Sequence, residues 1–296
     1  MEPAGQNPRP AHYEIVPRQG LDFGLDGDIP KYWLGGDPFK TRFFDAMSTL
    51  FPEGEKFFIT CVRDYRDQIT DPVLNQEVKD FMRQEGQHGM VHTQFNNRLK
   101  AQGVGVDGIE EQMKRILGRI RKIMPRTFTL GQTAAAEHMT AIMAHSFFHR
   151  REVMEDADPR IRAMYAWHAV EEIEHKAVAY DVLTKVAKAS YFMRIFTMLY
   201  VSLIFPLHTF MIMSHMFKVD GFGWRQRAGL WFKGLWWLYK PGGLYLPVIP
   251  HYLKYYVPGY HPWKEGKMFS YERWLEVFGQ TNDPIAAGNA LHATGI

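Results

Sequence analysis

The chain has 296 residues and a net charge of +3, and no basic stripe interleaved with aromatic residues occurs before residue 190. This pattern gives no electrostatic footprint for a nucleic-acid-binding protein. The single cysteine, Cys61, lies among apolar residues, and one cysteine excludes both an internal disulfide and a cysteine-based zinc ribbon. The length suits one large helical domain, because no linker divides the helices that carry the candidate ligands.

The first twenty residues are polar and rich in proline, and they lack the apolar core of a secretory signal. We therefore expect a cytoplasmic protein with a loosely structured, irregular leader over residues 1–39. A pass along the rest predicts helices near 40–50, 54–69, 73–101, 108–123, 127–151 and 158–189. Asp71-Pro72 and Asp158-Pro159 are helix-start signals, and no strand-like alternation with hairpin turns stands out. The expected fold class is all-α.

The helices near 54–69 and 73–101 carry the first candidate ligands. In FPEGEKFFITCVRDY (51–65), Glu55 lies within an apolar pattern. In FMRQEGQHGMVH (81–92), Glu85 and His88 form a Glu-x-x-His motif, and His92 lies one turn beyond. These last three side chains fall within about 60° of one another on a helical wheel, so they share one face.

The helices near 127–151 and 158–189 repeat this arrangement. Glu137 is the only carboxylate in GQTAAAEHMTAIMAH (131–145), and WHAVEEIEHK (167–176) contains a second Glu-x-x-His. With His168 at zero, Glu172 lies about 40° to one side and His175 about 20° to the other. Glu171 falls on the margin of this stripe and Glu174 points away, so both are expected to be surface groups or groups that support the ligands.

The chain thus resolves into two helical hairpins, each supplying Glu and then Glu-x-x-His. A four-helix bundle that binds two metal ions needs this combination. The candidate catalytic and metal-ligating residues are Glu55, Glu85, His88, Glu137, Glu172 and His175. His92 and His168 are further candidate metal ligands, or groups that orient the ligands. The alternatives are satisfied buried ion pairs and, for Glu55, a carboxylate favoured by a helix N-terminus.

Other polar residues have weaker patterns. His138 and His145 flank Glu137 at poor angles and are expected to pack or to form hydrogen bonds. Tyr165 and Tyr180 are candidate redox-active neighbours, although nothing in the spacing requires it. We assign no chemistry to His251, His261 and Trp263. Carboxylate and imidazole ligands without a thiolate suit two iron ions or manganese, and zinc stays an alternative.

The C-terminal third changes in character. Residues 195–217 contain no charged residue, and the segment that follows is dense in Trp, Tyr, Lys and Pro. The apolar length could span a bilayer, but Pro206, His208 and His215 argue against a simple span. We expect a monotopic extension over residues 191–280 that packs on the bundle of residues 40–190 and lies on the inner face of the membrane, followed by a polar tail over 281–296. The expected interfacial aromatics are Trp231, Trp236, Trp237 and Tyr239. A buried core helix or an apolar dimer surface is the alternative.

Several stretches carry a resemblance to known families: FPEGEKFF, QEGQHGMVH, TAAAEHMTA, HAVEEIEHKAVAYD and YYVPGYHPW. In ligand pattern the chain resembles the ferritin-like di-iron carboxylate proteins. More closely, from about residue 40 to 265, it resembles a bacterial family called predicted metal-dependent hydrolases. That name implies hydrolysis, whereas the ligand pattern is more typical of oxygen-activating iron proteins.

Three functions follow as hypotheses. The leading one is a di-iron enzyme that uses O₂ to oxidise an apolar, lipid-like substrate, with electrons from an external donor, since no G-x-G-x-x-G and no cysteine-ligated cluster is present. The first alternative is a metal-dependent hydrolase of an ester or amide. The second is a non-catalytic storage or structural protein. A membrane surface, an apolar protein partner or a second copy of the chain is the expected macromolecular partner.

Overall fold

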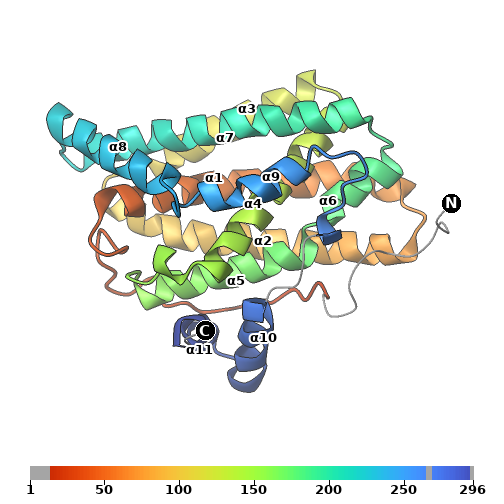
Figure 1. Ribbon diagram of the computed structural model, residues 1–296. Helices are drawn as coiled ribbons and strands as arrows, with labels where there is room; N and C mark the ends of the chain where they lie inside the picture. Colours follow the sequence, from red (N-terminus) through yellow and green to blue (C-terminus); the bar gives the residue numbers. More distant parts are fainter. Residues whose placement is uncertain (1–13, 265–268, 294–296) are drawn as a thin grey trace.

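The computed structural model describes residues 14–264 and 269–293 of the chain (Figure 1). This part of the chain is helical, and its only strand-like pairing is an isolated antiparallel bridge between Leu34 and Ala157. The prediction of an all-α fold is confirmed. The side chain of His145, the predicted packing histidine, lies outside the described residues, as do residues 1–13 of the leader.

The helices follow one another with short connections. Their bounds are α1 Pro38–Arg63, α2 Pro72–Ala101, α3 Val106–Ile123, α4 Arg126–His149, α5 Pro159–His175, α6 Val178–Asp181, α7 Tyr191–Val219, α8 Trp224–Tyr239, α9 Ile249–Lys254, α10 Phe269–Thr281 and α11 Pro284–Ala293. Four of them begin with an aspartate followed by a proline. The side chains of Asp37, Asp71, Asp158 and Asp283 accept hydrogen bonds from backbone N–H groups of the first turn, and proline at the first position needs no donor.

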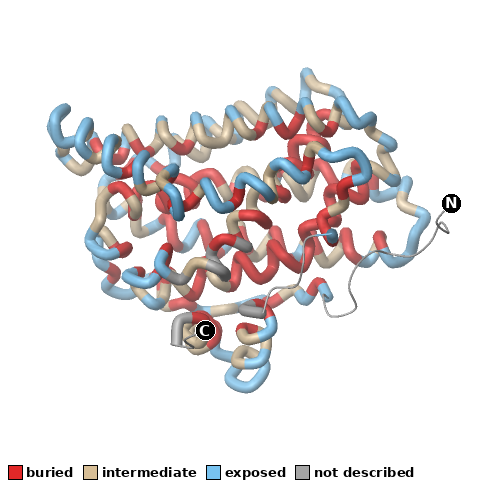
Figure 2. Tube along the Cα trace, in the orientation of Figure 1, coloured by how far each residue is buried: buried red, intermediate tan, exposed pale blue. Residues whose placement is uncertain are grey.

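The candidate ligands lie on α1, α2, α4 and α5, which form the bundle. Helix α1 packs on α2 and α4 packs on α5, with α3 and α7 along the outside. Figure 2 shows that the buried residues concentrate along the inner sides of these helices. Alanines at 134–136 on α4 and Gly131 keep this helix narrow, and a Cβ at Gly131 would lie 2.8 Å from Thr197 on α7. Small residues therefore allow α7 to pack closely on the ligand helix α4.

Two predicted helix boundaries are wrong. The predicted helices near 40–50 and 54–69 are one helix, α1, which continues through the buried Pro52 and ends at Arg63. Proline removes one backbone donor and usually kinks a helix. Here the buried side chains on both sides of Pro52, among them Leu50 and Phe57, hold α1 as one helix. The predicted helix near 158–189 breaks directly after His175 and continues as α6 and a π-helical turn over Val182–Val186.

Residues 14–37 and helix α11 are packed more closely than predicted. Residues 14–37 form no helix, yet Phe23, Trp33 and Leu34 are buried, so a loose leader is wrong for these residues. The expected polar tail is also wrong. Helix α11 packs on α5, where a Cβ at Gly288 would lie 2.7 Å from Ala163. Both segments cover the outer side of α5.

Helix α7 corresponds to the long apolar segment. It is the one helix of the described chain that is long and apolar enough to cross a membrane, and 22% of its most apolar window is buried. Arg194 near its first turn donates to the Tyr180 hydroxyl and to the Val257 carbonyl. Asp220, which caps its last turn, accepts two hydrogen bonds from the buried Arg42 of α1. Both ends of α7 are therefore tied to the rest of the fold.

Candidate metal centre

The predicted ligands converge in the middle of the bundle. Ligand atoms of two groups lie within 4.8 Å of one another in each group: Glu55, His88 and His168 in the first, and Glu85, Glu137, Glu172 and His175 in the second. All seven side chains are buried. Each of the four bundle helices supplies a carboxylate, as the two-hairpin pattern predicted.

The two Glu-x-x-His carboxylates, Glu85 and Glu172, belong to the second group and also lie near His88 of the first. His175 Nε2 is 3.1 Å from Glu85 Oε1 and 3.6 Å from Glu172 Oε2. On the other side, His88 Nδ1 is 3.7 Å from Glu85 Oε1 and 3.6 Å from Glu172 Oε1. Glu137 completes the second group, with Oε2 3.2 Å from His175 Nε2. The arrangement therefore offers two adjacent cation positions with two shared carboxylates.

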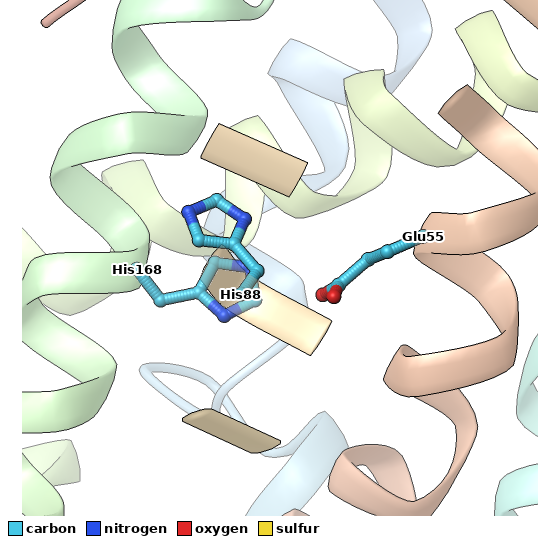
Figure 3. A group of neighbouring side chains, drawn as sticks. All are labelled: Glu55, His88 and His168. Carbon is cyan, nitrogen blue, oxygen red and sulfur yellow. The ribbon is translucent and has the colours of Figure 1, made fainter. Parts of the chain in front are cut away.

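The first group is seen in Figure 3, where the carboxylate of Glu55 reaches from α1 toward the rings of His88 and His168. The two rings stack with centroids 4.1 Å apart. Gly89, one residue after His88, leaves room for the carboxylate, because a Cβ there would lie 3.2 Å from Glu55 Oε2. The small size of Gly89 therefore allows the Glu55 side chain of α1 to come close to α2.

Several buried ligand atoms form no well-aligned hydrogen bond: Glu55 Oε1 and Oε2, Glu85 Oε1 and Oε2, Glu137 Oε2, His88 Nδ1 and His175 Nε2. Of these, His175 Nε2 lies within ion-pair distance of Glu85 Oε1 and Glu137 Oε2. A buried polar atom left unsatisfied costs about 1–3 kcal/mol, and native folds seldom accumulate such atoms at one place. Oxygen and imidazole nitrogen donors suit iron, manganese or zinc. These donors consequently fit a pair of metal ions.

The electrostatics point the same way. Burial, followed by repulsion from neighbouring carboxylates, raises the pKa of Glu55 and of Glu85 well above the usual range. Burial and the charge of Glu172 raise the pKa of Glu137 to about 7. Burial opposes a charged His175, but Glu172, Glu137 and Glu85 outweigh it and raise the pKa of that imidazole. The site therefore carries an excess of negative charge that protons partly neutralise, and metal cations would replace them.

A second layer of buried groups forms hydrogen bonds with the imidazoles of the two Glu-x-x-His motifs, His88 and His175. His88 Nε2 is 3.1 Å from Glu171 Oε2, and His175 Nδ1 is 2.8 Å from Gln84 Oε1. Gln84 Nε2 in turn donates to Glu174 Oε2 at 2.7 Å. Arg18 joins the two branches, with guanidinium nitrogens 3.2 Å from Glu171 Oε1 and 2.7 Å from Glu174 Oε1. Such partners orient an imidazole so that its other nitrogen faces the metal.

This layer corrects one prediction and completes another. Glu171 and Glu174 are fully buried, so the surface role is wrong, and they occupy the supporting positions given as the alternative. Sequence reasoning missed Gln84 and Arg18. Gln84 precedes His88 by one helical turn, so the helical wheel could have found it. Arg18 lies in an irregular segment and left no local signal.

His92 and His168 are joined by a hydrogen bond. His168 Nε2 is 2.9 Å from Glu172 Oε1, and its Nδ1 is 2.7 Å from His92 Nε2. His92 Nδ1 continues the chain to the Ser48 hydroxyl at 2.8 Å. His168 thus lies within the first ligand group, whereas His92 lies in neither group and holds His168 in place.

The remaining predicted residues lie outside the two groups. Tyr165 donates to the Phe44 carbonyl and packs against the ring of His92. His138 Nδ1 is 3.1 Å from the Tyr260 hydroxyl, which agrees with the expected hydrogen-bonding role. Tyr180 donates to the Tyr260 carbonyl, and His261 contacts Asp181. Of this set, Tyr165 approaches the candidate ligands through its ring contact with His92.

An apolar cavity leads toward the centre. It has a volume of about 110 Å³, is formed by α1, α3, α4 and α7, and is lined in part by Phe51, Thr140 and Phe205. A smaller pocket of about 40 Å³ shares these three residues and reaches His168 and Glu172. The Thr140 hydroxyl also donates a hydrogen bond to Glu172 Oε2. The cavity and the metal centre are therefore neighbours across Thr140 and Phe51.

The comparisons with known proteins give one match. A family model described as predicted metal-dependent hydrolase matches residues 17–266. Neither the curated proteins nor the solved structures gave a match. The resemblance to ferritin-like di-iron proteins in particular consequently stays a prediction.

We predict that Arg18→Gln destabilises the protein by about 3–5 kcal/mol, because it leaves Glu171 and Glu174 buried without a cation. Urea unfolding measures the loss. Arg83→Gln is the matched control, because this exposed arginine pairs with Asp80 at the surface and should contribute less than about 1 kcal/mol. Equal losses in the two variants would show that the buried layer does not depend on Arg18.

Metal binding should stabilise the protein more at high pH than at low pH. A carboxyl whose pKa is raised in the folded state loses its favourable contribution as the pH rises through that pKa, which is about 7 for Glu137. A cation removes this loss because it favours the ionised carboxylate. At a hundredfold excess over Kd, metal should raise the melting temperature by roughly 5–10 °C. Thermal scans with metal and with chelator on both sides of neutral pH measure the difference, and a pH-independent shift would contradict the assignment.

Proposed function

The chain belongs to the predicted metal-dependent hydrolase family, and from that premise we propose that it uses two metal ions to hydrolyse an ester or amide bond in an apolar, lipid-like substrate. The observation that carries the proposal is the convergence of unsatisfied buried carboxylate and imidazole atoms at the inner end of an apolar cavity. The donors supply a metal site, and the cavity supplies the class of substrate.

The proposed division of ligands follows the contacts. Glu55 and His88, with His168 beside them, would hold one metal, and Glu137 and His175 the other. Glu85 and Glu172 would be shared, because each lies near both imidazoles. Two metal ions in such a site supply an activated water and polarise a carbonyl oxygen.

The protein's own groups would position the substrate and the ligands. Thr140 lies in both pockets and donates to Glu172, so it ties a shared carboxylate to the wall of the cavity. Phe51 packs against the rings of His92 and His168 at centroid distances of 4.7 and 5.2 Å. An apolar chain in the cavity would therefore end beside Glu172 and His168, where the reacting bond would face the metals.

O₂-dependent oxidation, the leading hypothesis from sequence, becomes the second candidate. The comparisons support the hydrolase alternative and give no support to oxidation. The observation that favours oxidation is the donor set, in which carboxylates and imidazoles without thiolate suit iron, beside a cavity with little polar lining. Either reaction uses the same residues, so the metal and oxygen requirements distinguish them. The storage or structural alternative predicts metal binding without turnover.

The first test compares metals under anaerobic conditions. Metal-stripped protein reloaded with zinc or manganese should hydrolyse nitrophenyl esters of fatty acids without O₂. Glu55→Gln should lose one metal ion and lower the rate at least tenfold, since it removes a ligand of the first group. The control is Glu53→Gln, two residues away on the same helix and paired with Lys56. This variant should keep both metal ions and the rate of the unmodified protein. Metal analysis and ester hydrolysis are the readouts.

Two results would overturn the hydrolase proposal. An iron-loaded protein that consumes O₂ with an apolar substrate, but hydrolyses no ester, would establish the oxidation candidate. A fully metal-loaded protein without either activity would favour storage or a structural role.

The second test fills the cavity. Ala136 lines it on α4, so Ala136→Phe should occupy the space of an alkyl chain. We expect kcat/KM for long-chain esters to fall at least tenfold, while short-chain esters and metal content change little, because the metal centre is untouched. Met90→Phe, at an exposed position on α2, is the control for a new surface aromatic. Equal loss for short and long chains would show that substrates do not occupy this cavity.

A further inference from the structure

The outer side of α7 carries a continuous apolar stripe. Its exposed large residues recur every three or four positions: Phe192, Phe196, Leu199, Leu203, Leu207 and Met211. Phe192 and Leu203 are 81% and 72% exposed. A repeat of this kind places the side chains along one face of the helix, and exposed apolar surfaces of this extent mark interaction sites in soluble proteins.

Two neighbouring segments extend this surface. Helix α8 exposes Phe232, Leu235, Trp236 and Tyr239, and residues 246–257 expose Leu246, Ile249, Leu253 and Val257. Trp231 of α8 packs on Phe210 and Phe217 of α7, and Ser202 of α7 hydrogen-bonds to Tyr252 of α9. In Figure 1 these three segments lie in the upper part of the view and α10 and α11 at the bottom. We call the outer sides of α7, α8 and residues 246–257 the docking face.

The chain segment that forms the docking face is strongly basic. Residues 182–264 contain a single acidic residue, Asp220. Its carboxylate is buried and paired with Arg42 and Lys31. Between residues 221 and 264 the bases are Arg225, Arg227, Lys233, Lys240, Lys254 and Lys264. Aromatic residues with interspersed bases suit the headgroup region of an anionic bilayer.

We propose that the docking face binds flat on an anionic lipid bilayer, with α7 in the plane of the membrane. Both ends of α7 are tied to the fold through Arg194 and Asp220, and the helix packs on α1 and α4 along its inner side. Its 29 residues extend about 43 Å along the bundle. A helix held in this way buries its apolar stripe by lying on the bilayer, because crossing it would require the bundle to enter the lipid.

The cavity is bordered by the same helix, α7. Tyr200, Ile204 and His208 line the cavity on α7, and each directly follows a residue of the exposed stripe, namely Leu199, Leu203 and Leu207. A lipid chain would therefore move from the leaflet into the cavity without crossing bulk water. Only this step rests on the proposed function, since membrane binding does not need the metal centre.

The test is co-sedimentation of the full-length protein with vesicles of phosphatidylcholine, alone or mixed with phosphatidylglycerol. Binding should be stronger to the mixed vesicles and weaken with salt. The triple variant Phe192→Ser, Leu203→Ser, Phe232→Ser should bind at least tenfold more weakly, since three exposed apolar side chains no longer enter the lipid. The pair Lys233→Gln, Lys254→Gln should lower binding to the mixed vesicles roughly fivefold for each base removed.

The control variant is Val73→Ser, Met90→Ser, which changes two exposed apolar residues of α2 outside the docking face and should leave binding unchanged. Circular dichroism confirms that each variant is folded. Chelator-treated protein should still bind vesicles, which separates this proposal from the catalytic one. Absence of vesicle binding, or equal binding by the triple variant, would overturn the proposal. A dimer that the triple variant dissociates, without vesicle binding, would assign the face to a second copy of the chain.

Discussion

The structure depends on the balance of charge in the dry centre of the bundle. Glu55, Glu85, Glu137 and Glu172 approach one another around His88 and His175, and burial deprives them of water. Isolated carboxylates in such surroundings are costly, so the fold must supply cations or take up protons. Arg18 provides the cation for Glu171 and Glu174, which surround the candidate ligands. The candidate metal ligands instead have carboxylate oxygens and imidazole nitrogens without a hydrogen-bond partner. Two metal ions would bind these atoms and neutralise the carboxylates.

The same charge balance explains why Arg18 and helix α10 pack against α5. The helical wheel places Glu171 at the margin of the ligand stripe and Glu174 away from the centre, yet neither side chain is exposed. Arg18 from the leader binds both carboxylates, and Tyr271 of α10 donates to Glu174 at 3.0 Å. Trp274 packs under the guanidinium, 5.1 Å from its centre. The leader and α10 therefore close the site from outside, and removal of water strengthens each of these contacts.

How much could be predicted from the sequence depended on the range of the interaction. Glu85 and His88 were predictable because they lie one turn apart on one helix, and helical periodicity fixes their relative direction. The all-α fold followed from the same local patterns. Arg18 and Glu171 are 153 residues apart, so only the folded chain brings them together. Likewise, the continuation of α1 through Pro52 and the break after His175 are set by packing, which outweighs the local preference of a residue.

The centre is asymmetric, and this asymmetry bears on its chemistry. Toward the leader it is polar, with both motif imidazoles held by Glu171 and Gln84. Toward α3 and α7 it meets an apolar cavity, where Thr140 is the polar contact with Glu172. The polar side fixes the ligands, and the cavity on the apolar side gives a reacting group a path toward them. Because the lining on that side is apolar, the attacking water of the proposed hydrolysis would be one held among the carboxylates, where the low dielectric would strengthen its interaction with the metal ions.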